Sequence, residues 1–143
     1  MTNFANCVLK ITSNIINLDE NGSPDGALEK DEFTASGLIK TENGAVILSY
    51  KEKREGALIS CSVTAKGEAV EVSRRGDVVC DMIFSVGKTH KTIYKSPPFS
   101  FDMEINTLKL ENNIKNGSGS LSLFYTMTIG GAQKRCRMKI SLI

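Results

Sequence analysis

The fold is decided near the end of the chain by the stretch Ser120–Leu142, SLSLFYTMTIGGAQKRCRMKISL. From Leu121 to Ile129 every second residue is apolar, and serine, threonine and Phe124 stand between them. From Cys136 to Leu142 apolar residues alternate with arginine, lysine and serine. A period of two is typical of strands with one buried and one solvated face, and Gly130-Gly131 suits the positive φ angles of a tight hairpin. The stretch therefore predicts two antiparallel strands.

Similar strand-like segments fill the rest of the chain, and short turns rich in glycine separate them. The candidate turns are Asn43-Gly44, Glu55-Gly56, Lys66-Gly67, Arg75-Gly76-Asp77, Gly87-Lys88 and Asn116-Gly117. The pattern predicts strands near Cys7–Ile16, Glu32–Ile39, Ala45–Glu52, Ala57–Ala65, Ala69–Arg74, Val78–Ser85, His90–Lys95, Phe99–Leu110, Ser120–Ile129 and Ala132–Leu142. Short turns make consecutive strands antiparallel neighbours, so the sequence favours an up-and-down meander.

An open meander of this length would leave two exposed sheet edges, and closure into a barrel removes them. We therefore expect an all-β fold, a single antiparallel up-and-down meander barrel of about 8–10 strands. One domain is expected to span residues 1–143, with its longest loop over Asp19–Leu28. A two-sheet sandwich is the structural alternative, although its Greek-key topology needs longer crossovers than these turns provide.

Composition and charge are those of an ordinary globular domain. The 143 residues are 41% hydrophobic and 24% charged, with a formal net charge of +2, which is too balanced to indicate nucleic acid or membrane by charge alone. No signal peptide is recognisable, and no apolar run approaches the roughly 20 residues of a membrane helix. We expect a cytoplasmic protein with no membrane partner. Its oligomeric state stays open.

The residues that could support catalysis or metal binding are few and scattered. His90 is the single histidine, and it follows Gly87-Lys88-Thr89 with no nucleophile motif nearby. The four cysteines, Cys7, Cys61, Cys80 and Cys136, lack the spacing of a zinc site and stand in phase with apolar neighbours. We expect reduced thiols in the core. The sequence therefore predicts no catalytic residues, no metal, no cofactor and no enzyme activity.

A basic run, Lys134, Arg135, Arg137 and Lys139, lies in the last segment. Its last three members share the face opposite to the apolar residues, so a row of cations could meet phosphates. Most aromatic residues stand in the apolar phase instead, so the interleaved aromatics of a single-strand platform are lacking. The simpler interpretation is a solvated outer face, and a nucleic-acid partner is not expected.

Three parts of the chain carry a resemblance to a known family. They are the segment Val70–Gly76, VEVSRRG; the series Phe84, Tyr94, Pro97-Pro98-Phe99 and Thr107; and the closing hairpin from Gly119 to Ile140. They resemble the YwiB-like group of bacterial domains of unknown function. The resemblance implies a calycin, or lipocalin-like, β-barrel in a bacterial cytoplasmic setting and carries over no function. The chain departs from the family pattern at Ser100, where glycine is expected, and around Pro97-Pro98, so only the local turn differs.

Arg74 is the leading candidate for a ligand contact, because it shares a phase with the apolar Val70 and Val72. Such an arginine either closes the barrel through a salt bridge or meets an anionic ligand head. The expected ligand-binding residues are Arg74, Tyr50, Phe84, Tyr94, Phe101, Tyr125 and Met127. We expect a non-catalytic binder of a small apolar or amphipathic molecule inside the barrel. The alternative is an interaction module with a filled core, whose outer surface engages an anionic partner or a protein.

Overall fold

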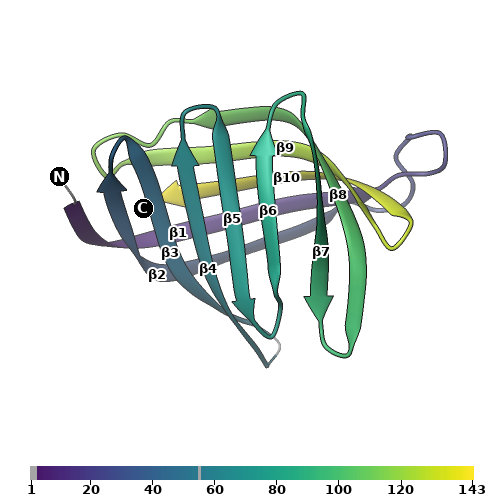
Figure 1. The fold of residues 1–143 in the computed structure, drawn as a ribbon, viewed down its shortest axis with the longest axis horizontal. Coiled ribbons are helices and arrows are strands. Elements are labelled where there is room, and N and C mark those ends of the chain that lie inside the picture. The colour runs from purple at the N-terminus through teal and green to yellow at the C-terminus, as the bar shows by residue number, and fades with distance from the viewer. Residues whose placement is uncertain (1–2, 55) are drawn as a thin grey trace.

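Ten β-strands form the described part of the chain, residues 3–54 and 56–143 of this computed structural model (Figure 1). The strands are β1 (Asn3–Asn17), β2 (Glu29–Glu42), β3 (Ala45–Arg54), β4 (Ala57–Lys66), β5 (Ala69–Gly76), β6 (Cys80–Ser85), β7 (Thr89–Ser96), β8 (Phe99–Asn112), β9 (Gly119–Ile129) and β10 (Ala132–Leu142). Each coincides with a strand predicted from the sequence, so the all-β prediction is confirmed. None of the described segments is a helix that could cross a membrane.

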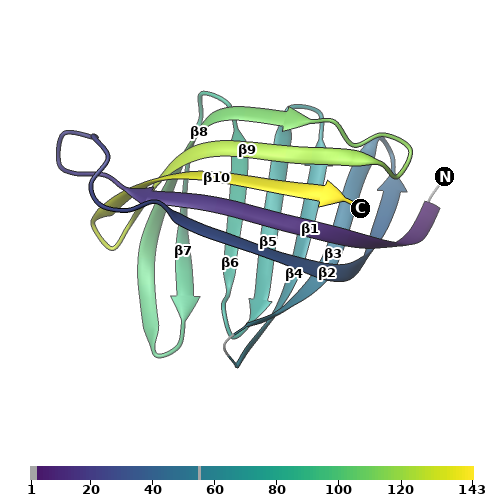
Figure 2. The same cartoon turned by 180° about the vertical axis from the view of Figure 1, so that it is seen from behind.

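The strands follow one another around a nearly closed barrel. Every neighbouring pair is antiparallel, and the order across the sheet is β6-β5-β4-β3-β2-β1-β10-β9-β8-β7. The strands nearest the two chain ends therefore pair with each other, from Leu9↔Leu142 to Asn17↔Lys134. In Figures 1 and 2, β4–β6 form one wall and cross the direction of β1, β9 and β10 on the opposite wall. The predicted up-and-down barrel is confirmed.

The ring is least complete between β6 and β7, the two edges of the sheet. Within the described chain their backbones are joined by one isolated bridge, in which Val79 and Lys95 exchange two hydrogen bonds of 2.9 Å. At the other end, the Ser85 N–H donates to the hydroxyl of Thr107 over 3.1 Å. The sequence predicted that this strand begins at Val78. In the structure β6 begins at Cys80, and Val79 before it belongs to the isolated bridge. The chain bends after Gly76, whose φ of 116° ends β5.

Hairpin turns at the barrel ends match the turn chemistry of the sequence. At Asn43-Gly44, both residues adopt positive φ angles of 50° and 79°. Two successive positive φ angles define the turn whose twist suits a two-residue hairpin. The predicted turn at Glu55-Gly56 falls partly outside the described residues. The turn between β7 and β8 contains a cis peptide bond between Pro97 and Pro98.

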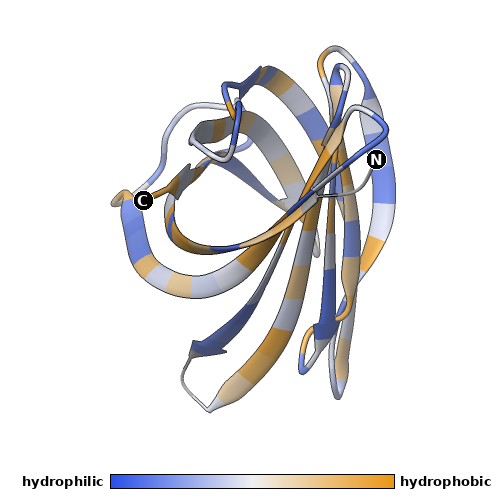
Figure 3. Cartoon of the chain, turned by 90° about the vertical axis from the view of Figure 1, so that its left-hand side faces the viewer, coloured by the Kyte–Doolittle hydropathy of each residue, from blue (hydrophilic) through white to orange (hydrophobic). Residues whose placement is uncertain are grey.

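The core occupies the space between the two walls, because alternate residues of every strand point inward. Figure 3 shows hydrophobic and hydrophilic bands alternating along the strands. At the centre, Phe84 of β6 is fully buried and meets Tyr125 of β9 edge-to-face, with ring centroids 4.8 Å apart. Cys61, Cys80 and Cys136 are buried among the apolar side chains and Cys7 is partly buried, and all four are free thiols.

Replacing Phe84 with alanine tests this view of the core. Removal of a fully buried aromatic ring leaves a cavity, so we expect Phe84→Ala to lower the free energy of unfolding by about 3–5 kcal/mol. Ile93→Ala on β7, where the side chain is 47% exposed, is the matched control and should cost less than about 1 kcal/mol. Urea titrations monitored by circular dichroism measure both values. Equal losses for the two variants would contradict the inward assignment of Phe84.

Candidate functional site

Arg74 points into the barrel, as the phase of its strand predicts. Val70 and Val72, on the same face of β5, are buried, whereas Glu71 between them is exposed. Across the sheet, Arg74 stands opposite Cys61 of β4 on one side and Cys80 of β6 on the other. The guanidinium therefore lies on the inner wall, near the end of its strand.

Glu52 neutralises Arg74 inside the barrel. The Arg74 Nη2 lies 2.9 Å from the Glu52 Oε2, and the two side chains are 22% and 13% exposed. Burial lowers the Arg74 pKa, but the nearby carboxylate of Glu52 offsets this effect, and the pKa of Arg74 is raised overall. Our sequence analysis did not identify Glu52, although its position two residues after Tyr50 on a predicted strand places it on the inner face.

Neutral polar groups surround this ion pair. Burial raises the pKa of Tyr50 and of Tyr125. Burial also raises the pKa of the Cys61 thiol and raises that of Cys80 to about 11. The protonated, neutral forms of these hydroxyls and thiols are therefore favoured beside the ion pair.

The other expected ligand-binding residues divide between the core and the rim. Phe84, Tyr50 and Tyr125 are buried in the core, whereas Tyr94 and Met127 are partly buried and pack against it. Phe101 faces the same side but lies beyond the core; it is 40% exposed and stacks on Phe99, which is 62% exposed. Period-two phase placed these residues on the inner side, but it could not show how deeply each of them is buried.

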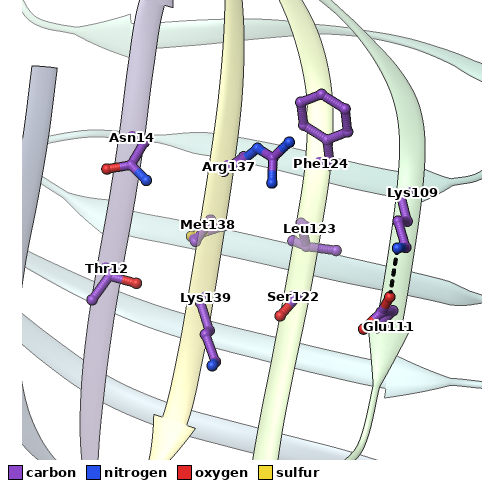
Figure 4. Close-up of a pocket in the computed structure, with 10 residues that line it drawn as sticks. All are labelled: Thr12, Asn14, Lys109, Glu111, Ser122, Leu123, Phe124, Arg137, Met138 and Lys139. Carbon is purple, nitrogen blue, oxygen red and sulfur yellow. Dashed lines mark ion pairs between the residues drawn. The ribbon is translucent and has the colours of Figure 1, made fainter. Parts of the chain in front are cut away.

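A second candidate site lies on the outer face of the barrel. A hollow of about 440 Å³ crosses β1, β10, β9 and β8 (Figure 4). Outward-facing side chains in its lining are Thr12, Asn14, Lys109, Glu111, Ser122, Phe124, Arg137 and Lys139. Glu111 is held by Lys109 over 2.9 Å, and this pair lowers the pKa of the Glu111 carboxyl. An adjoining hollow of about 630 Å³ shares Asn14, Phe124 and Arg137 and also contacts Arg135.

We call these two hollows together the basic groove. Arg135, Arg137 and Lys139 form no ion pair with any residue in the ranges 3–54 and 56–143. Arg137 instead lies over the ring of Phe124, with its guanidinium carbon 4.4 Å from the ring centroid. Figure 4 shows these two side chains on adjacent strands, where the register pairs them directly. The groove thus combines uncompensated positive charge with an aromatic ring.

His90 stands apart from both candidate sites. Its side chain is partly buried, and its Nε2 lies 3.4 Å from the backbone carbonyl of Asp81, across the junction between β7 and β6. Within the described residues, no three histidine, cysteine, aspartate or glutamate side chains gather as ligands for a metal ion.

The energetics of the inner ion pair can be tested with two neighbouring arginines. Arg74→Met removes the guanidinium that contacts the mostly buried carboxylate of Glu52, so we expect a loss of about 2 kcal/mol in the free energy of unfolding, less than for a fully buried pair. The added change Glu52→Gln should restore part of this loss, because it removes a largely buried negative charge. The control is Arg75→Met, whose partner Asp81 is largely exposed, and it should cost at most about 1 kcal/mol. Additive effects of Arg74→Met and Glu52→Gln in urea titrations would show that the pair is not coupled.

Comparison with known proteins agrees with the barrel fold. Residues 10–140 match the family described as Domain of unknown function (DUF1934). The "Uncharacterized beta-barrel protein YwiB" of Bacillus subtilis (strain 168) is 26% identical over 110 residues, which cover 77% of this chain and 78% of that protein. The crystal structure of the ywiB protein from Bacillus subtilis matches with a TM-score of 0.77 at 20% identity, covering 96% of this chain and 93% of that chain.

The relation suggested by the closing hairpin and the segment Val70–Gly76 is thus confirmed, and so is the barrel. The name of the Bacillus subtilis relative gives a fold and no activity. With its match over most of the sequence, the chain belongs to the DUF1934 family of domains of unknown function.

Proposed function

We propose that this barrel is a non-catalytic binding module that holds an anionic partner in the basic groove. The observation that supports this proposal is the uncompensated charge of Arg135, Arg137 and Lys139 along one hollowed face. Arginine binds phosphate and carboxylate groups through paired hydrogen bonds, and it does so best where no acidic neighbour already occupies it.

The contrast with the inner wall strengthens this choice. Arg74 is already neutralised by Glu52, so an anion at that position would have to displace a carboxylate at 2.9 Å. In the basic groove, the acidic side chain of the lining, Glu111, is turned to Lys109 and not to the arginines. An incoming anion therefore meets less competition on the outer face than inside the barrel.

Charge reversal in the groove tests the proposal, with labelled heparin as the anionic probe. We expect Arg137→Glu combined with Lys139→Glu to weaken heparin binding about tenfold or more at low salt, because two cationic contacts become repulsive. The control combines Lys88→Glu with Lys91→Glu, two exposed lysines at β7, and makes the same change in net charge. Fluorescence anisotropy measures the affinity, and circular dichroism checks the fold.

Two outcomes would contradict this proposal. One is the absence of heparin binding by the unchanged protein at low ionic strength. The other is an equal loss of affinity in the control variant, which would assign binding to net charge and not to the groove.

A second candidate function is the binding of a small amphipathic molecule inside the barrel. It is favoured by Phe33, Tyr94 and Met127, which pack against the core yet remain partly accessible. Together with Arg74 they would offer apolar surface and one charged head contact. Interior sites of barrels commonly combine these two features.

The fluorescent probe 8-anilinonaphthalene-1-sulfonate, an apolar ring system with one anionic group, tests this second function. We expect saturable binding by the folded protein, and Arg74→Met should weaken it severalfold if the guanidinium meets the sulfonate. Near-ultraviolet circular dichroism of each variant excludes loosened packing, which also increases this fluorescence. A failure of the folded protein to bind the probe would count against an interior ligand.

We further propose a cytoplasmic location and no cofactor. The four free thiols support the location, because reducing compartments keep cysteines unpaired.

A further inference from the structure

We infer that the anionic partner of the basic groove is a single-stranded nucleic acid. This inference rests on the proposed function and adds the chemical class of the partner. In this arrangement, phosphates follow the row Arg135, Arg137 and Lys139, and one base stacks on Phe124. Our sequence analysis did not expect such a partner because most aromatic residues share the apolar phase. Phe124 stands in the other phase, beside the cations.

The spacing of the cations suits an extended phosphate chain. Arg135, Arg137 and Lys139 alternate along β10, so consecutive members are about 7 Å apart along the strand. This spacing is comparable to the distance between successive phosphates of a stretched single strand. A flexible strand can follow such a line within the groove, whereas a stiff duplex presents its phosphates on a curved surface.

Phe124 supplies a surface for a base. It lies opposite Arg137 in the register of β9 and β10, and Arg137 covers part of its ring. Its neighbours on the same face of β9 are Ser122 and Thr126, both shorter than a phenyl ring. Phe124 is partly buried, and its ring and the guanidinium of Arg137 are two planar groups of the groove. Aromatic rings and arginine planes are the usual stacking partners of unpaired bases.

The polar rim of the groove suits bases and sugars. Thr12 and Asn14 on β1 and Ser122 on β9 line the same hollow, and their hydroxyl and amide groups can both donate and accept hydrogen bonds. An acidic peptide would use the cations but leave the aromatic ring without a planar partner. A membrane surface would favour a protruding apolar rim, whereas this site is hollowed and has charged, hydroxyl and amide side chains in its lining.

An oligonucleotide binding experiment can separate this inference from the proposed function. The probe is a fluorescein-labelled oligoadenylate of about 12 nucleotides, which is within the range that single-strand binding barrels occupy. We expect Phe124→Leu to weaken its binding about tenfold, because leucine keeps the apolar bulk but loses base stacking. Phe99→Leu, at an exposed ring outside the groove, should leave binding unchanged. Heparin carries no bases, so Phe124→Leu should leave its affinity intact.

Salt dependence gives a second measurement. Three phosphate contacts on a single strand predict a slope of about −2 for the logarithm of the binding constant against the logarithm of salt concentration. Arg137→Glu should make this slope shallower. A slope near zero for the unchanged protein would overturn the inference.

Three competing ligands supply the remaining outcomes. If the oligoadenylate fails to bind while heparin binds through the groove, the nucleic-acid inference is overturned and the proposed function stands. If both fail, both are overturned. Tighter groove binding by polyglutamate, by a DNA duplex, or by vesicles of phosphatidylcholine and phosphatidylglycerol would also overturn the choice of a single strand. Preferential binding of the oligoadenylate, lost in Phe124→Leu, supports it.

Discussion

The pairing of β1 with β10 is the interaction on which the rest of this structure depends. Backbone hydrogen bonds from Leu9↔Leu142 to Asn17↔Lys134 turn a linear meander into a nearly closed barrel. Without them, both strands would present open edges, and the inner faces of the two walls would lose their common core. The same pairing sets Thr12 and Asn14 of β1 beside the cations of β10. The closed core and the outer groove therefore both depend on the pairing of β1 with β10.

The place where the barrel is weakest follows from this pairing. A meander closed by its end strands would ordinarily be complete, yet here the edges of the sheet lie in the middle of the chain, at β6 and β7. The bridge between Val79 and Lys95 holds one end of the junction, and the buried hydroxyl of Thr107 accepts a bond from Ser85 at the other. The neighbouring strand pairs elsewhere are joined by longer backbone ladders, with one register shift between Thr107 and Lys109 in the β8–β9 pair.

Much of the fold and part of the candidate sites could be predicted from local patterns. Alternation of polarity indicates which face of a strand is buried, and it predicts Arg74 on the inner face and Arg137 on the outer face. Depth, however, depends on where strands cross, so the same alternation could not show that Phe101 is exposed while Tyr125 is buried. The partnership of Arg74 with Glu52 also needs the register between β3, β4 and β5, which no single strand contains. The hollow on the outer face could not be predicted from single strands either, because it depends on the shape of the whole sheet.

The pairing of the chain ends also has a consequence for how the molecule is made. Leu9 and Leu142 are separated by 133 positions (142 − 9) yet are direct neighbours in the sheet. Contacts so distant in sequence form late and slow folding, because a long loop must close before they stabilise anything. During synthesis, the earlier strands emerge from the ribosome well before β10 exists to receive β1. Until β10 has been synthesised, the edge of β1 that will pair with it is therefore open to incorrect strand pairing.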